Sequence, residues 1–520
     1  MYHSGIRAAD AGGSRPLARY PVKHTGLRHA ARSRRVALIT ALLAVAIGSC
    51  KKEATSPTIG SKLAFTIQPT NSTVDSSIVP AITVQVQDEN GNIATGSTTL
   101  VSLSLNSPSA SANLVGTAAV DAVGGIATFP YLAVNQAGTG YTLTASASNL
   151  TSATSNTFNV TQITSGPFTQ VGAGGSSTCG VTTNGNGYCW GFNNTGQLGN
   201  GATTNSTTPV RVAGGLSFKS VSAGSLSQFA CGLTTGGAAY CWGYNDYGQL
   251  GAGTFTNSSS PLAVTGNLTF VSLSAGGSGH ACAVSAAGAA YCWGNNGTGE
   301  LGVSSIPYTS TPVAVQGGLV FSSISAGENG ETCGVTTAGA GYCWGFNGDG
   351  ELGNGSTATT NVPTAVAGGL TFQSISAGFS STCGITTAGA AYCWGTNTYG
   401  ELGNGGTTAS TMPVAVTGGH TFTSVSVGDE FACGVTTNGT VYCWGYGSQG
   451  QLGTGAITNS SSPAALFGGL TFASVSAGYA SACAVTAGGA AYCWGNNTYG
   501  QLGNQSVTAT IEPVLVVTPP

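Results

Sequence analysis

Fourteen cysteines in the C-terminal two thirds of the chain form seven pairs, and the two members of every pair lie ten positions apart. Such thiols can either oxidise to disulfides or coordinate a metal ion. Zinc sites normally combine more closely spaced cysteines with further Cys or His ligands, and the whole chain contains only five histidines. We therefore expect one disulfide in each pair: Cys179–Cys189, Cys231–Cys241, Cys282–Cys292, Cys333–Cys343, Cys383–Cys393, Cys433–Cys443 and Cys483–Cys493.

The residues between paired cysteines predict a β-hairpin. A glycine follows the first cysteine by six positions in every pair, as Gly185 does in the first. A three-residue loop at 183–185 places this glycine where the backbone needs a positive φ. Counting outward from the loop brings Cys179 opposite Cys189. Opposed Cβ atoms in such a ladder lie near the separation that a disulfide requires.

The other residues of catalytic type form no recognisable catalytic arrangement. His280 and His420 are the only histidines after residue 29, and we interpret His280 as a partner of a loop backbone and His420 as a turn residue, with catalysis by His280 as the alternative. Glu300, Glu351 and Glu401 stand where the other repeats have Gln. We expect these carboxylates to accept backbone hydrogen bonds within a turn, with a cation site as the alternative. The sequence therefore predicts no catalytic residue, no metal, no cofactor and no enzyme.

The hairpins belong to units that repeat with a period of 50–52 residues, as the spacing of the seven tryptophans shows. Each unit contains four short strand-like runs, of which "FKSVSAG" at 218–224 is one example of the first. This period with several strands per unit is typical of a β-propeller. We expect an all-β fold with a seven-bladed propeller over residues 168–517. Side chains alternate along a strand, so Tyr188 and Trp190 should fill the wedge between blades while Cys189 faces the other way. Whether blade boundaries coincide with the repeat is left open.

Units such as "AYCWGTNTYGELGNG" and "TCGITTAGAAYCWG" resemble the regulator of chromosome condensation repeat family. The resemblance covers all seven units, about two thirds of the chain, and implies a seven-bladed propeller. Known roles in the family include nucleotide exchange on a small GTPase, chromatin binding and, in secreted bacterial versions, protein inhibition of β-lactamase. The resemblance thus implies protein–protein contact by loops on one propeller face. This chain departs from nuclear members in its paired cysteines and acidic charge, and a nuclear GTPase partner does not fit.

Residues 1–50 have the composition of an export signal. A basic segment precedes an apolar run from Val36 to Ile47, which is typical of a secretory signal peptide and too short for a stable transmembrane helix. The ending Ile47-Gly48-Ser49-Cys50 resembles a bacterial lipobox, which predicts lipidation of Cys50 and an extracytoplasmic lipoprotein, with the outer membrane or cell surface as its location. The alternative is a free secreted protein in which Cys50 is incidental. Residues 51–60 are interpreted as a polar tether.

Residues 61–163 alternate apolar and polar side chains in six or seven short runs separated by turn signals. This pattern predicts a β-sandwich, and the segment resembles bacterial immunoglobulin-like domains of surface proteins. "DENGN" at 88–92 is interpreted as a hairpin turn because Asn-Gly favours one. A calcium loop is the alternative.

The charge distribution argues against a nucleic-acid ligand. After Cys50 the chain has 5 Lys and Arg against 15 Asp and Glu, a net charge of −10. Binding to a phosphate backbone requires clustered Lys and Arg. We therefore expect no nucleic acid as a partner, and a membrane contact only through the lipid.

The segment between the first and second strands varies from unit to unit while the frame around it stays constant. We expect these loops to gather on one face near the channel and to bind an unidentified protein ligand, so that the chain acts as a non-catalytic scaffold. Loop variation without a partner, a glycan-binding or glycan-acting propeller, and a mainly architectural surface protein are the alternatives. The candidate partner-binding residues are Gln228, Phe229, His280, Glu328, Glu331, Phe379, Asp429, Glu430, Phe431 and Tyr479.

Overall fold

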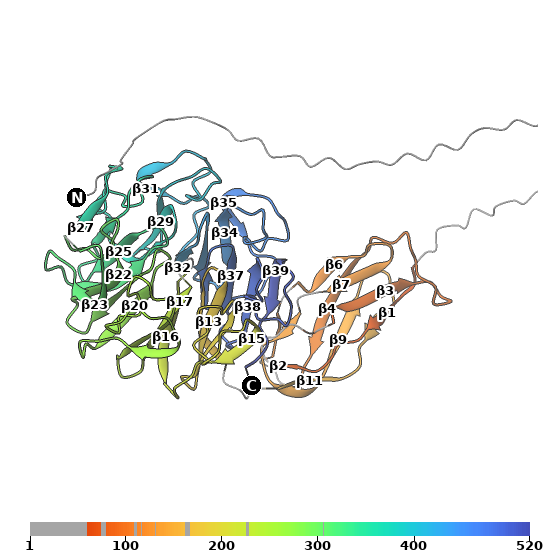
Figure 1. Ribbon diagram of the computed structural model, residues 1–520. Coiled ribbons are helices and arrows are strands. Elements are labelled where there is room, and N and C mark those ends of the chain that lie inside the picture. The colour runs from red at the N-terminus through yellow and green to blue at the C-terminus, as the bar shows by residue number, and fades with distance from the viewer. Residues whose placement is uncertain are drawn as a thin grey trace, which may run out of the picture. The chain divides into compact units, whose positions relative to one another are not determined.

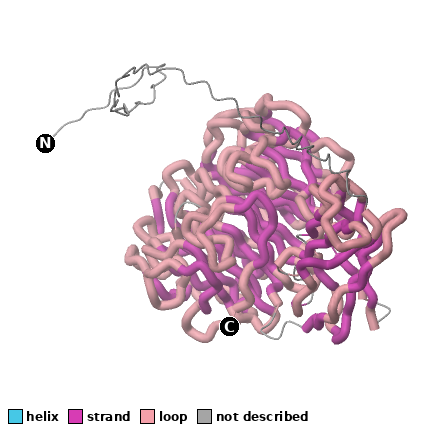
Figure 2. Tube along the Cα trace, turned by 90° about the vertical axis from the view of Figure 1, so that its right-hand side faces the viewer, coloured by secondary structure: helices cyan, strands magenta, loops and turns pink. Residues whose placement is uncertain are grey.

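The computed structural model describes residues 60–73, 78, 80–108, 112–115, 117–129, 132–161, 167–224, 228–304 and 306–519. The predicted signal peptide, the lipidation site Cys50 and residues 51–59 of the predicted tether lie outside these residues. Figure 2 shows strands and loops in the described part of the chain. None of the described residues forms a helix long and apolar enough to cross a lipid bilayer.

Residues 60–161 form β-sheets around one apolar core. A three-stranded sheet has the order β1-β3-β7 (Lys62–Ile67, Ile82–Gln87, Ile126–Phe129). A larger sheet has the order β2-β11-β9-β4-β6, with β10 paired to β9, and β5 pairs with β8. The strand β3 alternates buried and half-buried residues, so its buried face supplies Ile82, Val84 and Val86 to the core. The other strands are β2 Ser72–Thr73, β4 Leu100–Asn106, β5 Leu114–Val115, β6 Ala119–Asp121, β8 Ala133–Val134, β9 Gly138–Ser146, β10 Ala153–Thr154 and β11 Phe158–Thr161.

The segment 88–92 is a turn that satisfies its own carboxylate. Asp88 Oδ1 accepts hydrogen bonds from the backbone N–H of Asn90 at 2.9 Å and of Asn92 at 2.8 Å, and Oδ2 accepts one from Asn92 Nδ2 at 3.1 Å. The hydrogen bond from the Asn92 side chain is the main reason that the pKa of Asp88 is lowered. The expected hairpin turn thus uses this carboxylate for its own N–H groups.

Residues 168–515 form seven four-stranded antiparallel sheets, the blades of a β-propeller (Figure 1). Each blade takes its four strands from one sequence repeat, in chain order. The first strands are β12 Phe168–Ala173, β16 Phe218–Ala223, β20 Phe270–Ala275, β24 Phe321–Ala326, β28 Phe372–Ala377, β32 Phe422–Val427 and β36 Ser474–Ala477. The second strands are β13 Ser177–Thr182, β17 Phe229–Thr234, β21 His280–Ser285, β25 Glu331–Thr336, β29 Ser381–Thr386, β33 Phe431–Thr436 and β37 Ser481–Val485.

The third and fourth strands complete each blade. The third strands are β14 Gly187–Gly191, β18 Ala239–Gly243, β22 Ala290–Asn295, β26 Gly341–Gly345, β30 Ala391–Gly395, β34 Val441–Gly445 and β38 Ala491–Gly495. The fourth strands are β15 Ser206–Arg211, β19 Ser258–Ala263, β23 Tyr308–Ala314, β27 Thr360–Ala365, β31 Ser410–Ala415, β35 Ser460–Ala465 and β39 Thr510–Leu515. Blade and repeat therefore share their boundaries, which answers the question that the sequence left open.

All seven disulfides lie inside blades, between the second and third strands. Cys179 pairs directly with Cys189 across the β13–β14 ladder, and the Cα atoms of the bonded pairs are 4.0–4.1 Å apart. Gly185 has a φ of +75° in the connecting loop. The hairpin register and the cysteine pairing expected from the ten-residue spacing are thus confirmed.

Each disulfide packs against the aromatic side chains of the following blade. Cys282 and Cys292 share a buried cluster with Phe321 and Trp344, whose ring centroids are 5.8 Å apart. The cluster of Cys483 and Cys493 contains Phe168 and Trp190 of the first blade. The predicted wedge between blades therefore exists, with the phenylalanine of the first strand beside the tryptophan.

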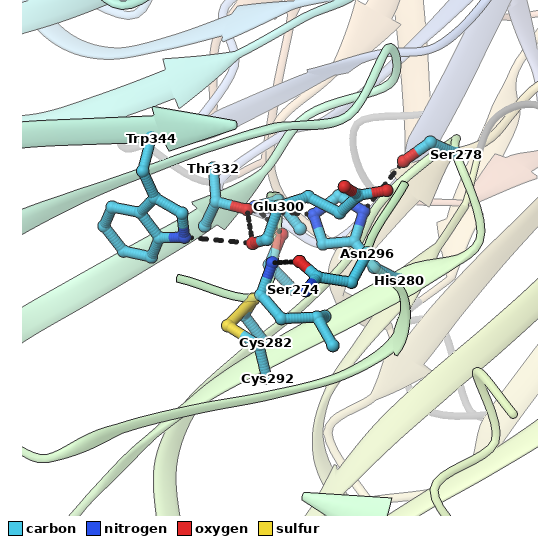
Figure 3. The surroundings of a disulfide bond; sticks show 11 residues. Ser274, Ser278, His280, Cys282, Cys292, Asn296, Glu300, Thr332 and Trp344 are labelled. Carbon is cyan, nitrogen blue, oxygen red and sulfur yellow. Dashed lines mark hydrogen bonds between the residues drawn. A yellow bond between two sulfur atoms is a disulfide. The ribbon is translucent and has the colours of Figure 1, made fainter. Parts of the chain in front are cut away.

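The recurring "GQLG" or "GELG" turn joins neighbouring blades. The Trp344 indole N–H donates to the backbone carbonyl of Glu300 in the preceding blade at 2.9 Å (Figure 3), and the other six tryptophans make the equivalent bond. Gly302 of the same turn has a φ of +67°, and a Cβ there would lie 3.0 Å from the indole nitrogen. Glycine is therefore required both by the backbone conformation and by the approach of the indole.

The same bond closes the ring between the last and first blades. Trp190 Nε1 donates to the carbonyl of Gln501 at 2.9 Å, and the Thr178 hydroxyl donates to the same oxygen at 2.8 Å. The backbone N–H of Ala173 donates to Ser476 Oγ at 3.0 Å. The first strand of blade 1, β12, contacts β36 and β37 of the last blade directly, where the yellow and blue ends of the propeller meet in Figure 1. Side-chain and backbone contacts between two blades thus complete the circle, without a shared sheet.

Candidate functional site at the channel mouth

The first strands of the blades line a central channel of about 320 Å³. Its wall is composed of Ser, Ala and Val from these strands, with Gln170, Gly172 and Glu328 as the exceptions. Ser222, Ser274 and Ser325 each accept a hydrogen bond from a backbone N–H of the next blade. The channel wall is therefore small, polar and used to hold blades together.

The loops that connect first to second strands surround one end of this channel. We call them the mouth loops; they comprise residues 174–176, 224–228, 276–279, 327–330, 378–380, 428–430 and 478–480, of which 225–227 are not described. Backbone hydrogen bonds join successive loops, from Glu328 N to Gly378 O at 2.7 Å, from Phe379 N to Gly428 O at 3.2 Å and from Asp429 N to Gly478 O at 3.3 Å. Tyr479 N donates to Gly174 O at 3.3 Å. The rim is thus continuous from blade 4 through blade 7 to blade 1.

The structure buries half of the ten candidate contact residues. Phe229, His280, Glu331 and Phe431 are 0% exposed, and Glu328 is 7% exposed. The first four begin second strands, and their side chains fold under the glycine that opens the same mouth loop, as shown by Phe229 against Gly224 and His280 against Gly276. A fully buried side chain offers no surface to a partner, so the expectation for these four is corrected. Glu328 lines the channel.

The remaining candidates reach the surface of the rim. Tyr479 is 39% exposed, and Phe379, Asp429 and Glu430 are partly exposed. Gln228 is also partly exposed and has a φ of +50°. Their role in binding stays a prediction, now restricted to the residues that a partner can touch.

His280 belongs to a buried hydrogen-bond chain between two blades. Its Nδ1 lies 2.9 Å from Ser278 Oγ and its Nε2 lies 3.0 Å from Thr332 Oγ1, and the Thr332 hydroxyl donates to the Glu300 carbonyl at 2.8 Å (Figure 3). Burial lowers the pKa of His280 to about 3, so the ring is neutral at physiological pH. Its partners are hydroxyl groups, in place of the loop backbone expected from the sequence.

His420 lies outside this rim and packs on aromatic rings. Its ring centroid is 4.0 Å from that of Tyr442 and 5.8 Å from that of Phe422. These two ring contacts account for this side chain in the loop before β32.

Glu300, Glu351 and Glu401 have the expected structural role on one oxygen each. Their Oε2 atoms accept hydrogen bonds of 2.8–2.9 Å from the backbone N–H two positions earlier. The other oxygen differs between blades: Glu300 Oε1 accepts from Asn295 Nδ2 at 2.7 Å, whereas Oε1 of Glu351 and of Glu401 has no hydrogen-bond partner. Burial raises the pKa of Glu351 to about 6.

Carboxylates of the mouth loops add to this charge. Burial is the main cause that raises the pKa of Asp429 to about 7, and the neighbouring Glu430 and Glu401 contribute to this rise. Burial also raises the pKa of Glu331 well above its ordinary value, with Glu351 and Glu328 as further causes. Like charges therefore face one another across blades 4, 5 and 6. No group of three or more His, Cys, Asp or Glu side chains with metal-binding geometry occurs among the described residues.

Two tyrosines beside this acidic group were not singled out in the sequence. Tyr399 and Tyr446 lie in the turns after the third strands of neighbouring blades, with ring centroids 4.8 Å apart. Glu430 is the main cause of the raised pKa of Tyr399. A signal existed in the tyrosine of "NTYGELG", but only the fold brings that turn next to the mouth loop of the following blade.

The fold and its mouth define a seven-bladed β-propeller with one variable, loop-built face. A family model described as the regulator of chromosome condensation (RCC1) repeat matches residues 184–232, 236–284, 339–385, 388–435, 438–485 and 488–520. A second model of the same description matches residues 218–249, 372–401, 422–451 and 472–501. The chain belongs to the regulator of chromosome condensation repeat family.

Curated relatives share this repeat over part of their length. The chain is 32% identical to the ultraviolet-B receptor UVR8 of Arabidopsis thaliana over 206 residues, 38% of this chain and 45% of the receptor. It is 30% identical to the probable E3 ubiquitin-protein ligase HERC4 of Homo sapiens over 190 residues, 35% of this chain and 18% of the ligase. The chain thus spans less than half the length of these relatives.

Solved structures support the fold at low sequence identity. Human WBSCR16 has a TM-score of 0.59 at 19% identity, covering 64% of this chain and 94% of that protein. Yeast RCC1 (Prp20), solved with Kap60 bound, has a TM-score of 0.57 at 19% identity, covering 68% of this chain and 84% of that protein. Another structure of Prp20p, from Saccharomyces cerevisiae and described with its binding to Gsp1p and histones, has a TM-score of 0.53 at 22% identity, covering 60% and 80%.

Proposed function

We propose that this chain is an exported, surface-tethered binding scaffold that recognises a protein through the exposed side chains of its mouth loops. A lipid on Cys50 anchors it, residues 51–60 act as a tether, and the β-domain at 61–163 is immunoglobulin-like. The scaffold is non-catalytic and binds no nucleic acid. Seven disulfides favour an oxidising, extracytoplasmic location.

The recurring residues of the repeat, which we call the frame, and the variable mouth loops have different roles, and this difference supports the proposal. All seven tryptophans are 0% exposed, and the recurring turn is used for contacts between blades. The variable residues gather at a single rim that presents Phe379, Asp429, Glu430 and Tyr479. Aromatic side chains on an exposed surface are common anchors of protein interfaces. The Prp20p structures described with Gsp1p, histones and Kap60 provide examples of the same fold binding proteins.

A capture experiment with the processed chain tests the proposal. The variant Phe379→Ser, Asp429→Ser, Glu430→Ser and Tyr479→Ser removes the exposed rim side chains and leaves the fully buried Glu331 and Phe431 in place. A matched control replaces four exposed side chains outside the mouth: Phe255, Tyr308, Met412 and Ile457. We expect surface proteins of the same cells to be retained by the parent and the control and lost with the rim variant.

Equal recovery of proteins by parent and rim variant contradicts the proposed site. Recovery of polysaccharide in place of protein, or hydrolysis of it, contradicts the class of ligand. No specific recovery with any variant favours a mainly architectural role.

A further inference from the structure

The described residues of the propeller contain few positive charges to set against the acidic side chains at the mouth. Among residues 168–520 the only Lys and Arg are Arg211 and Lys219, and both belong to the first two blades. Arg211 donates to Asn186 Oδ1 at 2.8 Å. Seven of the ten carboxylates in the same residues lie in the mouth loops, at the start of β25 or within a "GELG" sequence: Glu300, Glu328, Glu331, Glu351, Glu401, Asp429 and Glu430.

The carboxylates of blades 4 to 6 influence one another, and their effect extends to Tyr479 of blade 7. Glu351 and Glu328 raise the pKa of Glu331, while Glu430 and Glu401 raise that of Asp429. Asp429 is the first cause of the raised pKa of Tyr479, with Glu430 and Glu328 as further causes. The field therefore reaches from the buried group out to the exposed tyrosine.

Several buried oxygens of this group lack a hydrogen bond. Both carboxylate oxygens of Glu331 and one oxygen each of Glu351 and Glu401 are without a partner, and all three side chains are 0% exposed. Glu331 lies directly beneath Gly327, which opens the mouth loop of its blade. Burial without a hydrogen bond or a cation favours the protonated form of these carboxyl groups, and a cation brought beside them would favour the ionised form. This observation points to positive charge supplied from outside.

The exposed rim has side chains that can bind a Lys or Arg side chain of a partner. Asp429 and Glu430 are accessible carboxylates, and Tyr479 next to them is 39% exposed. The adjacent, tilted rings of Tyr399 and Tyr446 lie near Glu430. A carboxylate beside an aromatic face attracts both ammonium and guanidinium groups, by charge and by cation–π contact.

We propose that the mouth of blades 4 to 7 docks a basic segment of the partner protein, with Lys or Arg side chains placed between Asp429, Glu430 and Tyr479. This inference rests on the proposed function and specifies the chemistry of its ligand. The ionised forms of the partly exposed Asp429 and Glu430 supply a negative potential that steers the basic segment and increases its rate of association.

Fluorescence anisotropy with defined probes tests this docking. Three labelled synthetic peptides of equal length contain Gly and Ser interspersed with Arg and Lys, with Gln, or with Glu. The parent chain is compared with the double variant Asp429→Asn and Glu430→Gln. The control Asp121→Asn and Asp246→Asn removes the same charge from exposed residues outside the mouth. We expect the basic peptide to bind parent and control at least about tenfold more tightly than the Gln peptide, with most of this preference lost in the rim variant.

Three outcomes would overturn the docking of a basic segment. One is equal affinity for the basic and Gln peptides; another is unchanged binding of the basic peptide by the rim variant. The third is binding of Ca²⁺ alone, measured by calorimetry, that depends on Asp429 and Glu430 and displaces the peptide, which would make the mouth a cation site. If captured proteins still depend on the rim while basic peptides fail to bind, the proposed function stands and this inference fails.

Discussion

The seven interfaces between blades and the seven mouth loops have opposite relations to the sequence. At every interface a tryptophan indole donates to the carbonyl of the preceding turn over 2.7–2.9 Å, so the recurring phrase is explained by one contact made seven times. At the mouth, equivalent positions hold Glu328, Phe379, Asp429 and Tyr479, and only their backbone hydrogen bonds recur. The chain thus fixes the backbone of the rim and leaves its side chains free to differ.

The largest expected effect on stability comes from one substitution in the frame, compared with one substitution at the mouth. Trp394→Ala removes a fully buried ring, its contact with Phe372 at a centroid distance of 5.9 Å and its bond to Glu351 O. We expect a loss of about 3–5 kcal/mol in the free energy of unfolding. Tyr479→Ser, at the exposed rim, should change it by less than about 0.5 kcal/mol. Denaturant unfolding of both variants measures the contrast, and similar losses would show that the rim is also part of the frame.

Much of the frame could be predicted from the sequence because it depends on local spacing. The hairpin register follows from ten residues between cysteines with a glycine such as Gly185 at the turn, and the alternation of Tyr188, Cys189 and Trp190 determines which face each occupies. The partner of the indole could not be predicted in this way. The carbonyl that accepts the hydrogen bond from the Trp344 indole lies 44 residues earlier in the chain. Only the closure of the blades into a propeller brings the two groups together.

The sequence predicted the location of the mouth loops, but it did not predict which of their residues are exposed. Variation between repeats located the loops, yet it did not distinguish a residue that points outward, such as Tyr479, from one that folds inward. Four of the inward-folding residues are the first residues of second strands: Phe229, His280, Glu331 and Phe431. Their side chains lie under the glycine that opens the mouth loop. In blades 5 to 7, by contrast, the residue directly after the glycine that opens the mouth loop is partly exposed: Phe379, Asp429 and Tyr479.

A smaller effect is expected from removing one disulfide of the frame. Cys333→Ala with Cys343→Ala deletes the bridge of the fourth blade, whose atoms pack against Phe372 and Trp394 of the fifth. Closing a short loop stabilises a chain by about 2–3 kcal/mol through the unfolded state, so the variant should lose about that much in denaturant unfolding under oxidising conditions. With reductant present throughout, parent and variant should unfold at similar denaturant concentrations. Equal stability under oxidising conditions would contradict a stabilising bridge.

The smallest expected effect is the pH dependence of stability that Glu351 causes. This residue belongs to a recurring turn and lies close enough to Glu331 to raise its pKa. Burial holds the pKa of Glu351 at about 6, above the ordinary value of 4.5, so folding favours the protonated form. This stabilisation is complete below pH about 4 and is lost as the pH rises through about 6. The variant Glu351→Gln has no carboxyl group to titrate. Its amide oxygen can still accept the backbone hydrogen bond, as Gln501 Oε1 accepts one from the Tyr499 N–H at 2.9 Å in another blade.

From pH 4 to pH 8, the unfolding free energy of Glu351→Gln relative to the parent should therefore increase by about 1–2 kcal/mol. The reciprocal change Gln197→Glu provides the matched control, since Gln197 Oε1 accepts from the Thr195 N–H at 3.0 Å in a blade away from the acidic group. If burial in the turn alone raises the pKa, the two substitutions should give pH profiles of opposite sign and similar size. If the neighbouring mouth carboxylates contribute, the effect at Glu351 should be larger and should shrink at high salt. Parallel profiles for parent and Glu351→Gln would contradict the titration of this group altogether, and with it the coupling between frame and mouth.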